Sequence, residues 1–211
     1  MKIWSDSFKD NSAIPAKYAF GDIDPSTRIK LSDNLNPHLA WSDLPAGTKS
    51  LAIICHDYNV PSVGDDVNQE GKSISADLPR VDFYHWILID LPASVSAVAE
   101  GEYSSGITPR GKSGPAAPHG SKQGINDYTA WFAGDADMSG DYYGYDGPCP
   151  PWNDTILHNY VFTVYALSVE KLALGERFGG ADVLAAMEGN ILGKAQITGI
   201  YTLNPDLAST I

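Results

Sequence analysis

A chain of 211 residues with 43% hydrophobic content can bury a sizeable core, and we expect one domain over residues 1–211. The formal net charge of −12 disfavours nucleic acids and anionic membrane surfaces as partners, because both repel an acidic protein at long range. No run approaches the about 18 apolar residues of a membrane helix, the first residues form no apolar signal segment, and two cysteines are too few for a disulfide scaffold. We therefore expect a soluble, cytoplasmic protein with reduced thiols and no integral membrane association.

Four apolar segments predict the strands of the core. They are rich in Ile, Val, Leu, Tyr and Phe and end near Gly, Pro or Asp: Lys49–Cys55, Phe83–Leu91, Tyr160–Leu167 and Ala195–Leu203. Both alternating faces of the third segment are mostly apolar, which indicates a central strand covered on two sides. The polar segment Ser62–Pro79 separates the first two strands and predicts an excursion from the sheet.

The remaining segments predict loops and little helix. Half of the 20 glycines fall within residues 101–147, which indicates a long loop with one strand at Tyr128–Phe132. Ser168–Leu174, followed by Gly175, predicts one or two helical turns, and Asp182–Met187 predicts a second short helix. The expected fold class is therefore mainly β, a β-sandwich with a few short peripheral helices.

The run Gly147-Pro148-Cys149-Pro150-Pro151 predicts the rigid wall of a pocket. Each proline fixes its own φ and removes a backbone donor, whereas Gly147 permits a close approach to the backbone and would leave its N–H free for a ligand. A wall of this kind suits a small anion.

Four side chains can complete an anion site without lysine or arginine. His85, His158 and Tyr160 offer ring N–H and hydroxyl donors, and Asp57 can accept from a histidine ring nitrogen, fix its tautomer and favour its protonated form. Loss of Asp57 is then expected to weaken anion binding, although it removes a negative charge.

Three segments together resemble the signature of the phosphatidylethanolamine-binding protein family, in its bacterial and archaeal Raf-kinase-inhibitor-like branch. They are the proline wall with His158-Asn159-Tyr160, His56-Asp57-Tyr58-Asn59-Val60-Pro61, and Phe83-Tyr84-His85-Trp86. Asp57 and Pro61 match the ends of the family's acidic motif, whereas Tyr58 and Asn59 depart from it, and Asn159 stands where the family commonly has Arg. The segments 34–42 and 44–52 are also similar to family segments.

The resemblance implies a β-sandwich with a small cavity at one end and a binding or regulatory function without catalysis. It implies a small phosphorylated or carboxylated ligand, such as phosphate or a phospholipid headgroup, and no cofactor. The ligand-binding residues that we expect are Asp57, Pro61, His85, Gly147, Pro148, Pro150, His158 and Tyr160. A kinase or protease as protein partner and a homodimer are further expectations from the resemblance.

The sequence leaves other functions open. A hydrolase could use Asp57, His85 and His158, with or without a metal ion, but the chain has no serine-nucleophile motif. An inhibitor could instead act through an exposed loop. The loop Asp135–Asp146 partly mimics a calcium loop, although a solvated acidic loop held by Asx turns is the preferred interpretation. Cys149 is expected to be an inert thiol.

Overall fold

The computed structural model describes residues 1–211, and strands dominate it. The strands are β1 (Lys2–Trp4), β2 (Ser12–Ala13), β3 (Gly21–Asp24), β4 (Arg28–Leu31), β5 (Leu39–Ser42), β6 (Ser50–Pro61), β7 (Arg80–Pro92), β8 (Ala97–Val98), β9 (Lys122–Gln123), β10 (His158–Leu167) and β11 (Ile191–Tyr201). The helices are η1 (Ala16–Tyr18), η2 (Pro118–Gly120), α1 (Tyr128–Trp131), α2 (Gly180–Met187) and α3 (Pro205–Ala208). The predicted fold class, mainly β with a few short helices, is confirmed.

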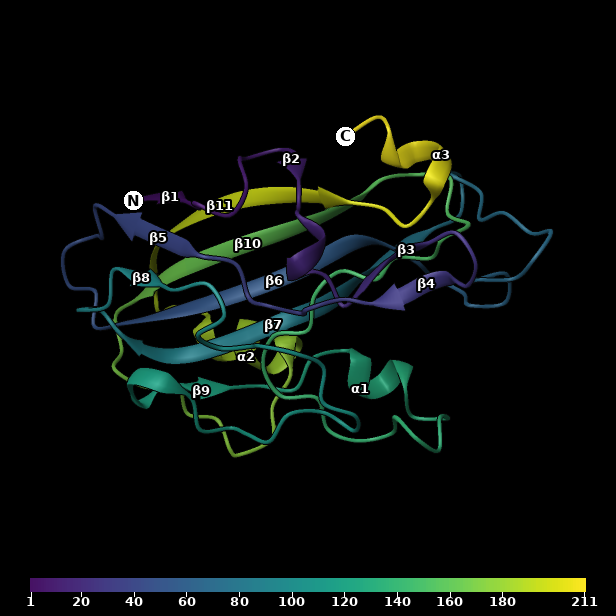
Figure 1. The fold of residues 1–211 in the computed structure, drawn as a ribbon. Helices are drawn as coiled ribbons and strands as arrows, with labels where there is room; N and C mark the ends of the chain where they lie inside the picture. Colours follow the sequence, from purple (N-terminus) through teal and green to yellow (C-terminus); the bar gives the residue numbers. More distant parts are fainter.

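A six-stranded sheet with the order β2-β11-β10-β6-β7-β9 forms the centre of the molecule (Figure 1). Its long antiparallel strands β6, β7, β10 and β11 coincide with the four strands predicted from the sequence. The predicted central position of the third segment is also confirmed, because β10 pairs with β11 on one side and with β6 on the other. The strand β6 continues beyond its predicted end at Cys55 and carries Asp57.

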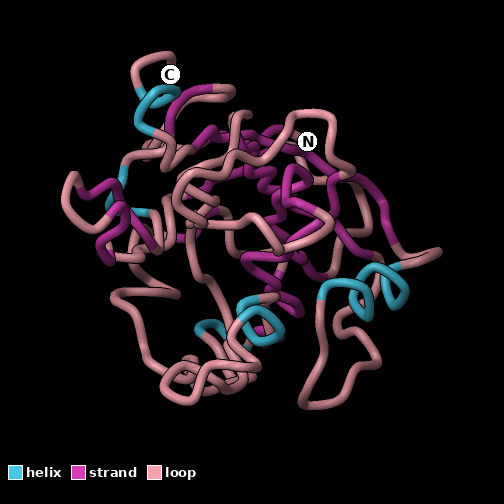
Figure 2. The backbone as a smooth tube through the Cα atoms, turned by 90° about the vertical axis from the view of Figure 1, so that its right-hand side faces the viewer, coloured by secondary structure: helices cyan, strands magenta, loops and turns pink.

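Both faces of the central sheet are covered by apolar contacts. Along β6, Leu51, Ile53 and Cys55 belong to the larger hydrophobic cluster, whereas the alternating Ala52 and Ile54 belong to a smaller one, as the two-residue period of a strand requires. The larger cluster includes residues of the small sheet β1-β5-β8, and the smaller one includes residues of α2. Figure 2 shows the strands gathered in the centre, with loops and short helices around them.

Two predictions of local structure were wrong. Tyr128–Phe132 was expected as a strand, but Tyr128–Trp131 is the short helix α1, and the Asn126 side-chain carbonyl accepts a hydrogen bond from the Tyr128 N–H at its start. Ser168–Leu174 was expected as a helix but is irregular. There the Asp90 carboxylate accepts from the Leu172 N–H at 2.9 Å. A helix this short is marginal, so tertiary contacts decide its conformation.

Two other predictions agree with the structure. The helix expected at Asp182–Met187 is α2, and the Asp182 carboxylate accepts from the Gly179 N–H at its start. The segment Ser62–Pro79 leaves the sheet between β6 and β7, with turns and no named strand or helix. The Asn153 side chain ties it down by donating to the carbonyls of Asp66 and Lys72.

Candidate functional site

A pocket of about 400 Å³ opens at one end of the central sheet. Its lining comes from β6, β7 and β10, from α1, from the 62–79 segment and from the proline run. Six of the eight predicted site residues line it: Asp57, Pro61, His85, Pro150, His158 and Tyr160. The strand register explains how they meet, because Tyr160 pairs with Asp57 across the β10–β6 ladder and Asp57 pairs with Phe83 across the β6–β7 ladder.

A β-bulge presents His85 to the pocket. Cys55 pairs with Trp86 and the next residue of β6, His56, pairs with Tyr84, so His85 is the extra residue of β7. Such a bulge locally re-aims a side chain and is common beside binding sites. The His85 ring is buried and lies edge-on to the Tyr160 ring, with ring centroids 5.1 Å apart.

The tautomer of His85 follows from its backbone contact. The Nδ1 atom lies 2.8 Å from the main-chain oxygen of Asp146, and because a carbonyl only accepts, Nδ1 carries the proton. Burial lowers the pKa of His85 below its ordinary value, which favours the neutral ring at neutral pH. The Nε2 atom of that neutral ring is then an unpaired acceptor, not the donor expected from the sequence.

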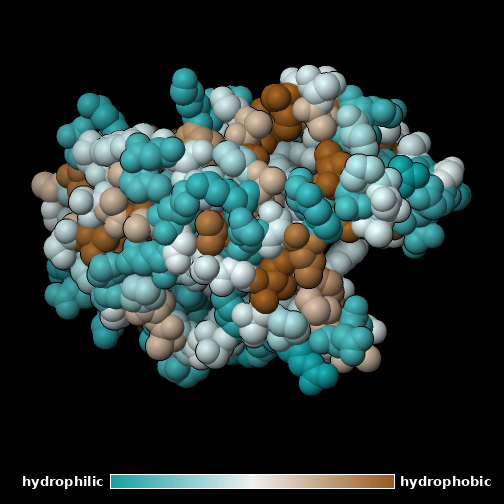
Figure 3. Space-filling model, viewed as in Figure 1, coloured by the Kyte–Doolittle hydropathy of each residue, from teal (hydrophilic) through white to brown (hydrophobic).

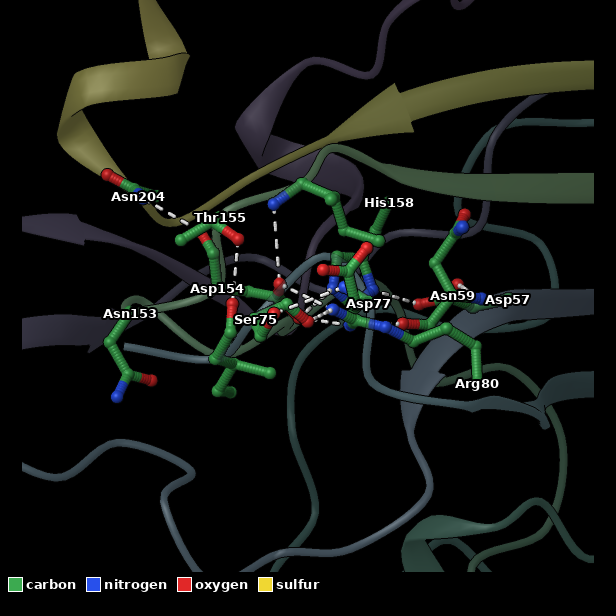
Figure 4. Close-up of polar contacts among 12 residues, drawn as sticks. Asp57, Asn59, Ser75, Asp77, Arg80, Asn153, Asp154, Thr155, His158 and Asn204 are labelled. Carbon is green, nitrogen blue, oxygen red and sulfur yellow. Dashed lines mark hydrogen bonds and ion pairs between the residues drawn. The ribbon is translucent and has the colours of Figure 1, made fainter. Parts of the chain in front are cut away.

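His158 is held by carboxylates at both ring nitrogens. Its Nδ1 atom lies 2.6 Å from Asp57 and its Nε2 atom lies 3.1 Å from Asp154 (Figure 4). Both nitrogens donate only when the ring is protonated. Burial opposes the charge, but the hydrogen bonds to Asp154 and Asp57 outweigh it and raise the pKa of His158 to about 9.

These contacts bear on two roles that the sequence predicted. Asp57 does accept from a histidine ring nitrogen, as expected of an orienting carboxylate. His158 was expected to donate to an anion, but both of its ring donors are already used within the protein.

Arg80 and Asp154 complete this cluster and were not found from the sequence. The Arg80 guanidinium donates to both carboxylate oxygens of Asp154, at 2.5 and 3.1 Å, and to the Asn59 carbonyl. Burial disfavours the charge on Asp154, but the His158 and Arg80 hydrogen bonds outweigh it and lower the pKa of this carboxyl. Two carboxylates and two cations therefore balance formally. The available signal was an acid four residues before His158, in Asn153-Asp154-Thr155.

Two predicted wall residues, Gly147 and Pro148, do not line the pocket. The Gly147 N–H was expected to be free for a ligand, but it donates to the Asn34 side chain at 2.8 Å. The close approach that requires glycine there is internal, since an added Cβ would lie 2.0 Å from the Tyr18 carbonyl oxygen. The Pro148 carbonyl accepts from Phe20 and Gly21 and so anchors the wall to β3.

Below the pocket, the buried Asp146 organises a second polar cluster. Its carboxylate accepts from Lys112 at 2.7 Å and from the amides of Asn34 and Asn126, each at 2.8 Å. Its backbone pairs with His85 twice, because the Asp146 N–H donates to the His85 carbonyl and the Asp146 carbonyl accepts from Nδ1. The cluster therefore fixes the position of the His85 ring.

The acidic loop Asp135–Asp146 does not bring its first and last residues together around one site. Asp135 accepts from the N–H groups of Asp137 and Met138, which is the predicted Asx turn, whereas Asp146 is buried with Lys112. No group of three or more His, Cys, Asp or Glu side chains is arranged to hold a metal ion. Burial raises the pKa of the pocket thiol Cys149 to about 12, so it is protonated at neutral pH.

We call the polar residues Asp57, His85, His158 and Tyr160 the floor of the pocket. The walls around this floor are mainly apolar, and neither lysine nor arginine lines the pocket. Figure 3 shows hydrophobic side chains gathered beside a hollow, between the right-hand lobe and the lower lobe that carries α1. No helix of the structure has the length and apolar character needed to cross a membrane.

The fold is mainly β, with a pocket at one end of its central sheet, and comparisons with known proteins define the class of the protein. Residues 4–202 match the family model described as phosphatidylethanolamine-binding protein. The chain belongs to this family.

Curated relatives and solved structures cover nearly the whole chain. The UPF0098 protein YbhB of Escherichia coli is 30% identical, with 96% of this chain and 100% of the relative covered. A UPF0098 protein of Aquifex aeolicus is 32% identical, with 95% and 88% covered. The structure of Chlamydia trachomatis CT736, described as a putative phosphatidylethanolamine-binding protein homologue, matches with a TM-score of 0.63 and 28% identity, covering 95% of each chain. That of E. coli YbcL matches with a TM-score of 0.65 and 25% identity, covering 95% of this chain and 97% of the other.

Proposed function

We propose that this protein is a non-catalytic binding protein whose pocket takes a small ligand with an acidic head, a phosphate or a carboxylate. Family membership supports a binding and regulatory role. The observation that carries the proposal is a pair of unpartnered polar atoms in the pocket floor. The Tyr160 hydroxyl and His85 Nε2 belong to buried side chains that line the pocket, and neither atom hydrogen-bonds to the protein.

These two atoms select for an acidic head that either brings a proton itself or binds together with a proton taken up by His85. Tyr160 donates to one ligand oxygen, and burial raises the pKa of this phenol, so the donor stays protonated. The lone pair of His85 Nε2 needs a proton opposite it, either from a monoprotonated phosphate or by protonation of the ring when a carboxylate binds. Binding is expected to be weak and reversible, because only one or two charge-assisted hydrogen bonds hold the head.

The hydrolase alternative loses His158 as a candidate general base in this geometry. With a pKa of about 9 and both nitrogens bonded to carboxylates, His158 is protonated at neutral pH and has no free lone pair. A kinase or protease as partner and a homodimer stay predictions that rest on family membership alone.

The proposal is tested by NMR titration of the histidine side chains with phosphate, phosphoethanolamine and acetate at pH 6. The His85 signals should shift, and Tyr160→Phe should weaken binding about tenfold by loss of a hydrogen bond to a charged group. Tyr165→Phe is the matched control, because Tyr165 lies on the same strand and does not line the pocket. Vesicles containing phosphatidylethanolamine separate a lipid headgroup from a free phosphate. If none of the small anions moves His85 at tens of millimolar, the proposal is wrong.

A further inference from the structure

The pocket is larger than an acidic head needs. A phosphate occupies only a few times the roughly 30 Å³ share of a water molecule. The pocket measures about 400 Å³, within the size range of cavities that enclose most of a small organic ligand. The head alone would leave most of this volume unfilled.

Aromatic rings form the wall that leads from the floor to the mouth. We call Phe20, Phe83, Tyr128 and Phe132 the aromatic wall, and all four line the pocket. Phe83 contacts the floor, with its ring centroid 4.8 Å from that of His85. The Tyr128 ring is nearly parallel to the rings of Phe20 and Phe132, at interplanar angles of 19° and 17°, whereas Phe20 and Phe132 are tilted by 36° to each other.

The aromatic wall is held in place before any ligand arrives. The Tyr128 hydroxyl donates to the Gly147 carbonyl at 2.8 Å, and the Phe83 ring packs against the Tyr128 ring almost perpendicularly, at 79°. Pro61, Pro150 and Pro151 supply further rigid apolar surface in the same pocket. A wall that is already ordered loses little conformational entropy when a ligand binds. A rigid, flat group also loses little, whereas a flexible chain must be ordered, so this surface favours the rigid group.

Trp131 lies at the mouth of the pocket and is 52% exposed. It follows Tyr128 and precedes Phe132 of the aromatic wall, at the end of α1. An exposed tryptophan beside stacked rings can pack its edge or its face against an aromatic ring of a ligand. Such ring–ring contacts contribute binding free energy beyond that of the apolar area they bury. Because neither lysine nor arginine lines the pocket, the body of the ligand should carry no further negative charge.

We propose that the ligand class of this pocket is an aryl acid, a carboxylate or monoprotonated phosphate on an aromatic ring. The head meets Tyr160 and His85, and the ring packs against the aromatic wall and Trp131. This inference rests on the proposed function and names the body of the ligand, which the floor alone does not determine.

Calorimetry at pH 6 with two pairs of ligands tests the inference: acetate with benzoate, and inorganic phosphate with phenyl phosphate. Each aryl compound should bind about tenfold tighter than its partner, as expected from ring packing and apolar burial. Trp131→Ala should reduce this advantage severalfold and leave acetate and phosphate affinity unchanged. Trp4→Ala is the matched control, since Trp4 is 45% exposed and does not line the pocket.

The outcomes separate the two proposals. Binding of acetate and phosphate with no gain from the ring would overturn the aryl-acid inference and leave the proposed function intact. Hexanoate binding as tightly as benzoate would overturn the choice of an aryl group, as would an equal loss in Trp4→Ala. Failure of all four ligands in a protein with a native circular dichroism spectrum would reject the proposed function itself. Phe132→Leu, which keeps apolar volume, gives a second test of the wall and should selectively weaken the aryl compounds.

Discussion

The Nδ1 atom of His158 lies 2.6 Å from the Asp57 carboxylate, and both side chains are buried. The opposite ring nitrogen contacts Asp154, so the protonated imidazole joins β10 to β6 and to the loop before β10. Both ring nitrogens donate to carboxylates only while the imidazole is protonated, so deprotonation of His158 removes one of these two hydrogen bonds.

Stability should therefore decline as pH rises above neutrality. The pKa of His158 is raised from 6.5 to about 9 in the folded protein, so its contribution is fully present below pH 6.5 and is lost as pH rises through 9. The contribution is on the order of 3 kcal/mol. Urea unfolding from pH 6 to 9.5 measures it. His158→Gln should lose this pH dependence, whereas His119→Gln, which removes an exposed ring, should retain it. Equal slopes in wild type and His158→Gln would contradict the assignment.

Asp57→Ala should destabilise the protein by about 3–5 kcal/mol, because it leaves a buried cation with one partner fewer. The sequence alone predicted weaker anion binding in this variant. The structure reverses that prediction, because Asp57 orients His158, whose donors do not face a ligand, and its loss removes a negative charge beside the pocket. Folded Asp57→Ala should bind phosphate equally well or tighter by calorimetry. Weaker binding by a demonstrably folded sample would restore the original role.

Lys112→Met tests whether the Asp146 cluster positions His85. Loss of the ion pair to a buried carboxylate should cost about 2–3 kcal/mol in urea unfolding, and the His85 NMR signals should shift because the Asp146 backbone holds that ring. Lys122→Met is the matched control. Its partner Glu176 is 77% exposed, so this substitution should cost below about 1 kcal/mol and leave His85 unchanged. Unchanged His85 signals in Lys112→Met would show that Asp146 does not depend on the lysine.

Local apolar patterns predicted the long strands of the central sheet. The hydrogen-bond partners of the site residues depend instead on contacts between distant parts of the chain. Segments rich in Ile, Val, Leu, Tyr and Phe identified all four long strands, and in β6, β7 and β10 the apolar residues continue on both faces because both faces are buried. The strand β11 contributes to the larger cluster only. Asp57, His85 and Tyr160 were predicted to converge from family motifs. The Arg80–Asp154 ion pair beside His158 was not predicted, since these two residues lie 74 positions apart in the chain, and the bulge at His85 is invisible in sequence. Tyr128–Trp131 misled because its aromatic residues favour strands, whereas Asn126 satisfies the first N–H of a helix.

Ligand binding should take up a proton at His85, which makes acetate affinity depend on pH. Acetate stays ionised between pH 6 and 8, so any change in affinity comes from the protein. Burial keeps the pKa of free His85 below 6.5, and the ring must become protonated to donate to the carboxylate from Nε2. Affinity should therefore fall by up to about tenfold per pH unit between pH 6.5 and 8.

Two substitutions separate the proton from the hydroxyl in this prediction. His85→Gln should abolish the slope with pH, whereas Tyr160→Phe should weaken binding at every pH and keep the slope, because the phenol stays protonated throughout. His56→Gln is the control, since this half-buried histidine lies on β6 and does not line the pocket. Calorimetry in two buffers of different ionisation enthalpy counts the proton directly and should give an uptake near one at pH 7.5. An uptake of zero with measurable acetate binding would mean that the anion is held without His85, by Tyr160 and the apolar walls alone.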